Sequence, residues 1–110
     1  MAITVNIYYT GQGDQAKQFA HEMLAQGVVA EIRREAGNLR YEYFLPMEEE
    51  GTVLLIDSWT DQAALDAHHH SPMMAKIMAL REKYDLHMRV ERYVTEDCGV
   101  PEKDQAYIRT

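Results

Sequence analysis

Three consecutive histidines lie in the stretch AHHHSPMM (67–74), and their side chains could bind a metal ion or transfer protons. Successive residues of a helix point about 100° apart, so three neighbouring imidazoles on a helix cannot converge on one ion. A structural zinc ion needs three or four nitrogen or sulfur ligands, and the other histidines, His21 and His87, are distant in sequence. We therefore expect no metal site here. His69 and His70 are expected to form a solvated helix end.

His68 differs from its two neighbours. It follows Leu65 by three residues, on the apolar side of a helix predicted over 61–70, so it can face a pocket. Two interpretations stay open. The side chain is either a hydrogen-bonded core histidine or a proton-transfer group that titrates near neutral pH.

Asp57 and Trp59 share one face of a strand predicted over 52–59. A carboxylate that faces an apolar interior needs a partner, and Arg33, His68 or a tyrosine could serve. One interpretation is a structural ion pair or hydrogen bond. The other is an acid or base with a raised pKa. Trp59 is expected to belong to the core and to form a pocket wall.

Tyr41 and Tyr43 point towards the same interior from a strand predicted over 38–46, and their hydroxyls could hydrogen-bond a phenolic substrate.

The sequence contains no motif that predicts a cofactor. The GQG at 11–13 lacks the third glycine of a dinucleotide-binding turn, and no nucleophile signature is present. We expect an enzyme without a cofactor, or a binding protein.

The hydrophobic pattern predicts the elements that must position these side chains. Alternation indicates strands, and apolar residues at helical spacing indicate helices. Asp14 and Asp61 or Thr60 suit helix N-caps, and Ser71 and Pro72 suit the cap and first position of a further helix. The expected order is strand 2–9, helix 14–27, short helix 28–37, strand 38–46, strand 52–59, helix 61–70, helix 72–85 and strand 86–95. This is the split βαβ, ferredoxin-like arrangement of an α+β protein.

The strand predicted over 52–59 is apolar on both faces at 53–56. A sheet with one solvated face would show alternation, so continuous apolarity indicates that both faces are covered. Helices of a chain this size can cover one face. A second copy is expected to cover the other, giving a homodimer with sheet packed against sheet, a dimeric α/β barrel.

Composition limits the remaining possibilities. The 110 residues suit one domain, predicted over 1–95, followed by a tail over 96–110 whose end, AYIRT, could pair with the partner's sheet or fray. The formal net charge of −7 makes nucleic acid and anionic membranes unlikely partners. A single cysteine, Cys98, allows no intrachain disulfide and fits the cytoplasm. No signal peptide or transmembrane segment is expected.

One set of positions resembles the pattern of the antibiotic biosynthesis monooxygenase domain family, which includes small quinol monooxygenases. The matching residues are Gly37, Tyr41, Asp57, Trp59, Leu65, His68, Ser71 and Pro72. The resemblance covers roughly 1–95 and is most specific from the tryptophan to the proline. It implies a ferredoxin-like dimer with a pocket between each sheet and its own helices.

The resemblance also implies an activity: cofactor-independent oxidation of a small quinol or polyphenol by O2. The expected catalytic residues are His68, Asp57 and Tyr41. The expected substrate-binding residues are Trp59, Tyr43, Met73 and Arg33. The alternatives are an isomerase of a small oxygenated metabolite and a non-catalytic dimeric binding module.

Two departures from the family pattern limit what is carried over. Met73 stands where many members have a second histidine, and Asp57 stands where many have glutamate. The haem-degrading sister group uses an asparagine, a tryptophan and a histidine. Here Asn6 is expected on the opposite face from Val5 and Ile7, and no histidine follows in 73–84. Haem degradation is therefore disfavoured.

Overall fold

A four-stranded antiparallel sheet forms the centre of the computed structural model, which describes residues 1–96 and 99–110. Cys98 lies outside the described residues. The strands are β1 (Ile3–Thr10), β2 (Asn38–Phe44), β3 (Thr52–Trp59) and β4 (His87–Val94). The helices are α1 (Gln15–Ala25), α2 (Val28–Arg33), α3 (Gln62–His69), α4 (Met73–Lys83) and α5 (Glu102–Gln105).

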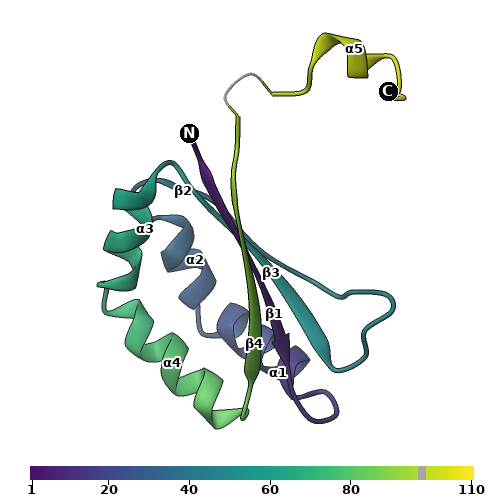
Figure 1. Cartoon of the computed structure of the whole chain (residues 1–110). Helices are drawn as coiled ribbons and strands as arrows, with labels where there is room; N and C mark the ends of the chain where they lie inside the picture. Colours follow the sequence, from purple (N-terminus) through teal and green to yellow (C-terminus); the bar gives the residue numbers. More distant parts are fainter. Residues whose placement is uncertain (97–98) are drawn as a thin grey trace.

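The strand order β2-β3-β1-β4 gives the ferredoxin-like topology that the sequence predicts. Figure 1 shows α1 to α4 on one side of the sheet, with the other side uncovered. The register places Asp57 beside Tyr41 of β2 and beside Val5 of β1. Residues from three strands therefore meet on the helix-facing side near the middle of β3.

The core lies between this face and the helices because apolar residues alternate along the strands. Ile3, Ile7 and Tyr9 of β1 are buried, as are Val53, Leu55 and Trp59 of β3. Trp59, Tyr9, Tyr41, Phe19 and Met23 are the bulkiest fully buried side chains. The exposed helix-facing positions are in β4, where Met88 is 42% and Val90 53% exposed. The helices thus leave the β4 side of this face open.

The expected alternation along β2 is wrong at its two ends. Leu39 is 57% and Leu45 59% exposed, although both were expected inside with Tyr41 and Tyr43. An irregularity in the pairing between Asn38 and Arg40 shifts the register and turns Leu39 outward. Leu45 follows the end of the strand, so it belongs to the loop.

The helix caps agree in part with the sequence. Asp61 accepts a hydrogen bond from the Ala64 backbone N–H at 2.8 Å, as predicted. Ser71 does not cap α4. Its hydroxyl instead donates to the backbone carbonyl of His68 at 2.7 Å and closes the end of α3. Asp14 is the N-cap residue of α1, as predicted. Its carboxylate does not bond a backbone N–H of the helix and instead accepts from the Gln18 side chain.

The apolar stripe expected along α4 is narrower than predicted. Met73, Ile77 and Leu80 are buried, whereas Met78 is 60% exposed.

On the uncovered face of the sheet, Leu54 and Ile56 of β3 are half-buried.

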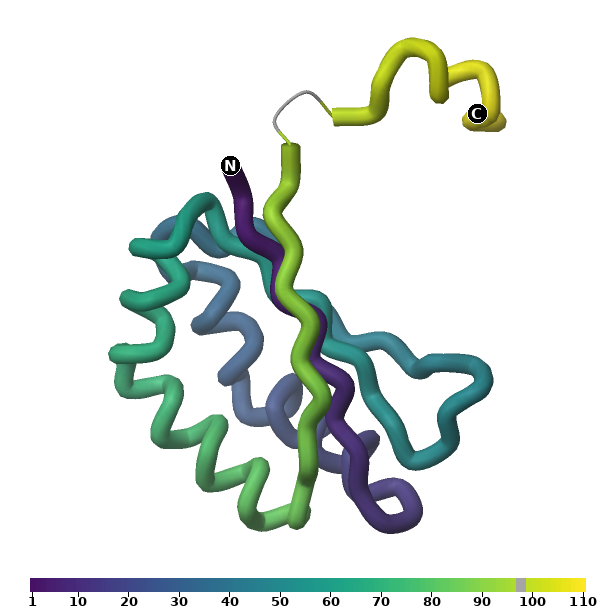
Figure 2. Tube along the Cα trace, in the orientation of Figure 1, coloured from purple at the N-terminus to yellow at the C-terminus, as the bar shows by residue number. Residues whose placement is uncertain are grey.

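Residues 99–110, which carry α5, lie away from the sheet (Figure 2). The AYIRT segment forms no strand within this chain; its pairing with a partner stays a prediction. In the part of the chain that the structure describes, no helix has the length and apolar character needed to span a membrane.

Candidate functional site

A cavity of about 260 Å³ lies between the sheet and the pair of helices α3 and α4. Asp57, Tyr41 and His68, the three predicted catalytic residues, all line it. They come from β3, β2 and α3, which the register and the helix packing bring to the middle of the sheet. The remaining lining residues are Val5, Ile7, Leu65, His69, Met74, Arg81, Met88 and Val90. The cavity is therefore mainly apolar, with a few polar groups in its wall.

His68 is 4% exposed and is held from two sides. Its Nδ1 lies 2.8 Å from Oε2 of Glu35, and its ring stacks on Trp59 at a centroid distance of 4.7 Å and an angle of 28°. Burial lowers the pKa of His68, while the Glu35 carboxylate opposes that shift. The imidazole is therefore held neutral at neutral pH, which suits a proton acceptor.

Asp57 is 5% exposed, and its carboxylate accepts a hydrogen bond from Trp59 Nε1 at 2.5 Å. This partner differs from the arginine, histidine or tyrosine that the sequence suggested. Burial raises the pKa of Asp57 to about 7, the Trp59 hydrogen bond lowers it, and the nearby Glu35 charge raises it. Asp57 can therefore hold or release a proton near neutral pH, which is the property needed in an acid–base group.

Tyr41 lines the cavity, and its hydroxyl group stays protonated. Its side chain is 2% exposed, and burial raises its pKa well above the usual 10. A phenol that stays protonated can donate a hydrogen bond to a ligand oxygen.

Arg33 fixes the backbone behind Tyr41. Its Nε and Nη2 donate to the Tyr41 carbonyl oxygen at 3.0 and 2.7 Å. Arg33 is exposed and lies outside the cavity, although the sequence suggested it as a substrate-binding residue.

The other predicted substrate-binding residues lie behind the cavity wall or elsewhere. Trp59 backs His68 and is fully buried. Tyr43 packs edge-to-face on Phe19 and borders a separate groove beside α1. Met73 is a buried core residue, and its neighbour Met74 lines the cavity. A difference of one residue, or 100° of helix rotation, separates the two methionines.

Two functional candidates were missed by sequence reasoning. Arg81 lines the cavity, and its Nε and Nη2 donate to the Tyr9 hydroxyl at 3.1 and 2.8 Å. Its position four residues after the buried Ile77 was the available signal, because an arginine on an apolar helix face requires a buried partner. Glu35 reaches His68 across 33 positions of sequence, and no local pattern indicates that contact.

The two neighbours of His68, His69 and His70, have separate environments. His69 lies at the edge of the cavity, and Nδ1 of His70 bonds the backbone carbonyl of Asp66 at 2.8 Å. Both are exposed. Among residues 1–96 and 99–110, no group of three or more histidine, cysteine or acidic side chains is arranged to hold a metal ion.

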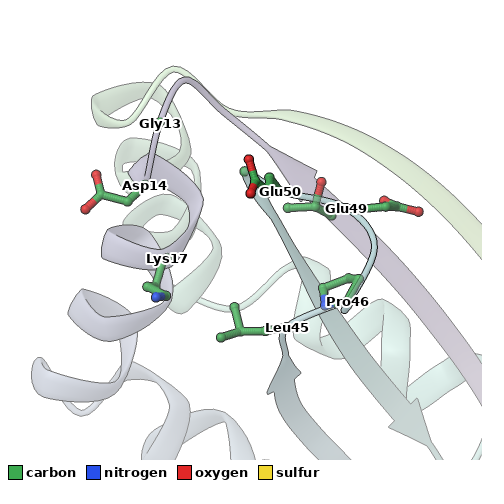
Figure 3. A pocket seen from close by; sticks show the side chains of 9 residues that line it. Gly13, Asp14, Lys17, Leu45, Pro46, Glu49 and Glu50 are labelled. Carbon is green, nitrogen blue, oxygen red and sulfur yellow. The ribbon is translucent and has the colours of Figure 1, made fainter.

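A second hollow of about 400 Å³ lies at the opposite end of the sheet, between the start of α1 and the loop after β2 (Figure 3). Asp14, Glu49 and Glu50 border it together with Lys17. Figure 3 shows the three carboxylates spread around the rim, not directed at one point. None of the predicted site residues lies there.

Comparisons with known proteins give the family and the fold of this chain. The family model described as antibiotic biosynthesis monooxygenase matches residues 2–80. The Bacillus subtilis (strain 168) protein named "Putative monooxygenase YcnE" is 30% identical over 69 residues, which are 63% of this chain and 70% of that protein.

Solved structures share the fold at lower identity. SnoaB, described as a cofactor-independent oxygenase from Streptomyces nogalater, is 16% identical and superimposes with a TM-score of 0.71 over 87% of this chain and 94% of its own. A conserved protein from Methanosarcina mazei Go1 is 21% identical, with a TM-score of 0.74 over 87% and 94% of the two chains. Because the family match extends over most of the β1–α4 region that builds the cavity, this chain belongs to the antibiotic biosynthesis monooxygenase family and is monooxygenase-like.

Proposed function

We propose that the protein is a cofactor-independent monooxygenase that oxidises a small quinol or polyphenol with O2. The observation that carries the proposal is the presence of His68, Asp57 and Tyr41 on one mainly apolar cavity of about 260 Å³. The description of SnoaB as a cofactor-independent oxygenase and the name of the Bacillus subtilis relative support the reaction class. The cavity volume suits a ligand of one or two aromatic rings.

The first step is removal of a phenolic proton. The neutral imidazole of His68 accepts it, and the Arg81 guanidinium lies on the same cavity, where it stabilises the phenolate. The Tyr41 hydroxyl donates to a second substrate oxygen and fixes the orientation of the ring. Apolar side chains, including Leu65 and Met74, exclude water from the electron-rich phenolate.

The second step is reduction of oxygen by the substrate itself. The phenolate transfers electrons to O2, and a ring carbon that carries hydrogen forms a C–O bond to give a peroxide. Asp57, protonated in part near neutral pH, donates a proton to the peroxide. The C–H proton is then lost as the O–O bond breaks. One oxygen atom becomes the new carbonyl of the quinone, and the other leaves as water. The quinol supplies all four electrons, so no external reductant is needed.

Oxygen uptake with a panel of hydroquinones and polyhydroxylated naphthalenes tests the proposal. One atom from labelled O2 is expected in the product of an accepted substrate. His68→Phe preserves an aromatic ring beside Trp59 and is expected to lower kcat about 100- to 10,000-fold, the range for loss of an acid–base group.

Other outcomes identify the alternatives. Anaerobic conversion of a substrate without oxygen uptake would contradict the proposal and indicate an isomerase. Ligand-induced thermal stabilisation without turnover of any compound would indicate a binding module. Unchanged turnover in His68→Phe would remove the assignment of His68 while retaining the reaction.

We also propose that the protein acts as a cytoplasmic homodimer through the uncovered face of the sheet. Its support is the half-buried pair Leu54 and Ile56 on a face that α1 to α4 leave uncovered. Ile56→Arg is expected to give monomers in sedimentation velocity, whereas Met78→Arg, at an exposed position of α4 on the helix side of the sheet, should leave the dimer intact. A monomeric wild type would contradict the dimer, and recovery outside the cytoplasmic fraction would contradict the location.

A further inference from the structure

We propose that Glu35 is a positioning residue that fixes the tautomer of His68, with the proton on Nδ1 and the lone pair of Nε2 available to the substrate. The inference rests on the proposed function for its catalytic consequence. The Glu35–His68 pairing itself can be tested without any substrate.

The turn after α2 places Glu35 firmly. Its backbone N–H donates to the carbonyl of Ile32 at 3.0 Å, and its carbonyl accepts from the N–H of Asn38 at 3.1 Å. The turn ends at Gly37, whose φ of 84° favours glycine, and the Gly37 carbonyl accepts from Thr60 N–H at 2.8 Å. The carboxylate is thus anchored between the end of α2 and the end of β3, beneath α3.

The hydrogen-bonding capacity of the carboxylate sets the direction of the bond. An ionised carboxylate only accepts hydrogen bonds, so the 2.8 Å contact requires a proton on His68 Nδ1. The other oxygen, Oε1, is buried and has no hydrogen-bond partner among the described residues. Nδ1–H is therefore the side-chain donor that stabilises this partly buried charge, and its loss would leave the carboxylate without one.

The second nitrogen of the ring is then the acceptor. His68 lines the cavity while Glu35 does not, so the Glu35 bond occupies the nitrogen that faces away from the ligand space. The hydrogen bonds of the described residues leave Nε2 without a partner. A neutral imidazole with this tautomer can accept a phenolic proton through Nε2, and the carboxylate stabilises the imidazolium that forms.

Of the charged groups around His68, Glu35 is the one that stabilises the protonated imidazole. Arg81 on α4 and the neighbouring His69 on α3 oppose a positive charge on the imidazole, whereas Glu35 favours it. Asp57 on β3, held by the Trp59 N–H, and the protonated Tyr41 on β2 complete the titratable groups on the sheet side. Removal of the Glu35 charge leaves the opposing Arg81 charge uncompensated.

Long-range ¹H–¹⁵N NMR of the imidazole reads the tautomer directly in the full-length protein. We expect the Nδ1–H form in the wild type. In Glu35→Gln, the amide can donate to Nδ1, so the Nε2–H form should increase. Glu31→Gln is the matched control, because Glu31 is an exposed residue of α2 outside the cavity; it should leave the tautomer unchanged.

On an accepted quinol, Glu35→Gln should lower kcat by up to about 10,000-fold with little change in KM, the loss seen when a catalytic histidine takes the wrong tautomer. The limb of the pH profile that reports His68 should also move to lower pH. A merely structural role for Glu35 would change stability without moving that limb.

The two proposals fail differently. An Nε2–H tautomer in the wild type, or the same tautomer in Glu35→Gln and wild type, would overturn this inference even if the protein consumes oxygen. Absence of oxygen uptake with the predicted tautomer would overturn the proposed reaction and leave the Glu35–His68 pairing intact. If Glu35→Gln fails to fold, the wild-type tautomer still decides the question.

Discussion

The imidazole of His68 lies against the indole of Trp59, with ring centroids 4.7 Å apart and an interplanar angle of 28°. The same indole donates its N–H to Asp57 at 2.5 Å. One buried tryptophan therefore contacts two titratable groups of the cavity, stacking on His68 and hydrogen-bonding Asp57. Changes at Trp59 can separate these two contacts.

Trp59→Phe should retain an aromatic surface for His68 and remove the hydrogen bond to Asp57. Because that bond stabilises the ionised carboxylate, its loss should raise the pKa of Asp57 above its value of about 7. Carbon-13 NMR of the carboxyl group measures the change. An unaltered or lower pKa would contradict the assigned role of the indole N–H.

Asp57→Asn should make the protein more stable at neutral pH and above. The folded-state pKa of about 7 lies above the usual 3.8, so the folded state binds the proton more tightly than the unfolded chain. The wild type therefore loses stability as pH rises from about 4 through 7, by up to about 4 kcal/mol at about 1.4 kcal/mol per pKa unit. The asparagine variant lacks this loss.

Urea unfolding of both proteins at pH 4 and pH 8 measures the difference. The gain of Asp57→Asn over wild type should be larger at pH 8. Asp66→Asn is the matched control, since Asp66 is exposed on α3 and should show no comparable change in the gain. A gain that is equal at the two pH values would show that Asp57 titrates normally.

Local sequence patterns were sufficient to predict the order of the helices and strands. They also predicted that Tyr41, Asp57 and His68 lie close together. Alternation along two strands and the three-residue spacing from Leu65 place these side chains on one face, and the fold then brings the strands together. Arg33 was predicted to bind the substrate, but its guanidinium bonds a backbone carbonyl. A long arginine side chain can donate to either kind of acceptor, and the sequence does not decide between them.

The missed features depend on contacts between distant segments. Glu35 meets His68 only after α2 and α3 have packed, and Arg81 meets Tyr9 across 72 positions. Met74, not Met73, lines the cavity, because Met73 lies on the side of α4 that packs into the core. Position in a family pattern does not decide which of two neighbouring helical residues faces a cavity.

Gly37→Ala should destabilise the protein more than Gly27→Ala. Both glycines have positive φ, 84° and 76°, so both substitutions carry the backbone cost of about 1–2 kcal/mol. A Cβ at Gly37 would also lie 2.5 Å from Ala64 Cβ and 2.7 Å from Thr60 Oγ1, whereas at Gly27 it would meet open space. Relieving that overlap should cost about a further 1–3 kcal/mol.

Thermal and urea unfolding compare the two alanine variants. The Gly37 variant should in addition displace α3, which carries His68, so its imidazole NMR signals should shift. Equal stability of the two variants would contradict the close packing of the 34–37 turn against α3.

Tyr9→Phe should remove the two hydrogen bonds that hold the Arg81 guanidinium in place. The Tyr9 hydroxyl is the acceptor for two guanidinium N–H groups, and its removal should cost about 2 kcal/mol of stability, the range for a hydrogen bond to a charged group. On an accepted quinol, KM should rise because Arg81 is no longer held towards the cavity.

Tyr84→Phe provides the control for Arg81. Tyr84 also bonds a charged side chain, Glu22, but lies outside the cavity. Its loss should affect stability and leave KM unchanged. An unchanged KM in Tyr9→Phe would show that Arg81 needs no help from Tyr9 to meet the ligand.

The exposed helix-facing positions of β4 indicate which step of the reaction limits kcat. Met88 and Val90 are about half exposed and line the cavity, so the ligand space opens alongside the outermost strand of the sheet. Ligand exchange through this opening requires no movement of a lid. Product departure should then be fast relative to chemistry, and kcat should not respond to solvent viscosity.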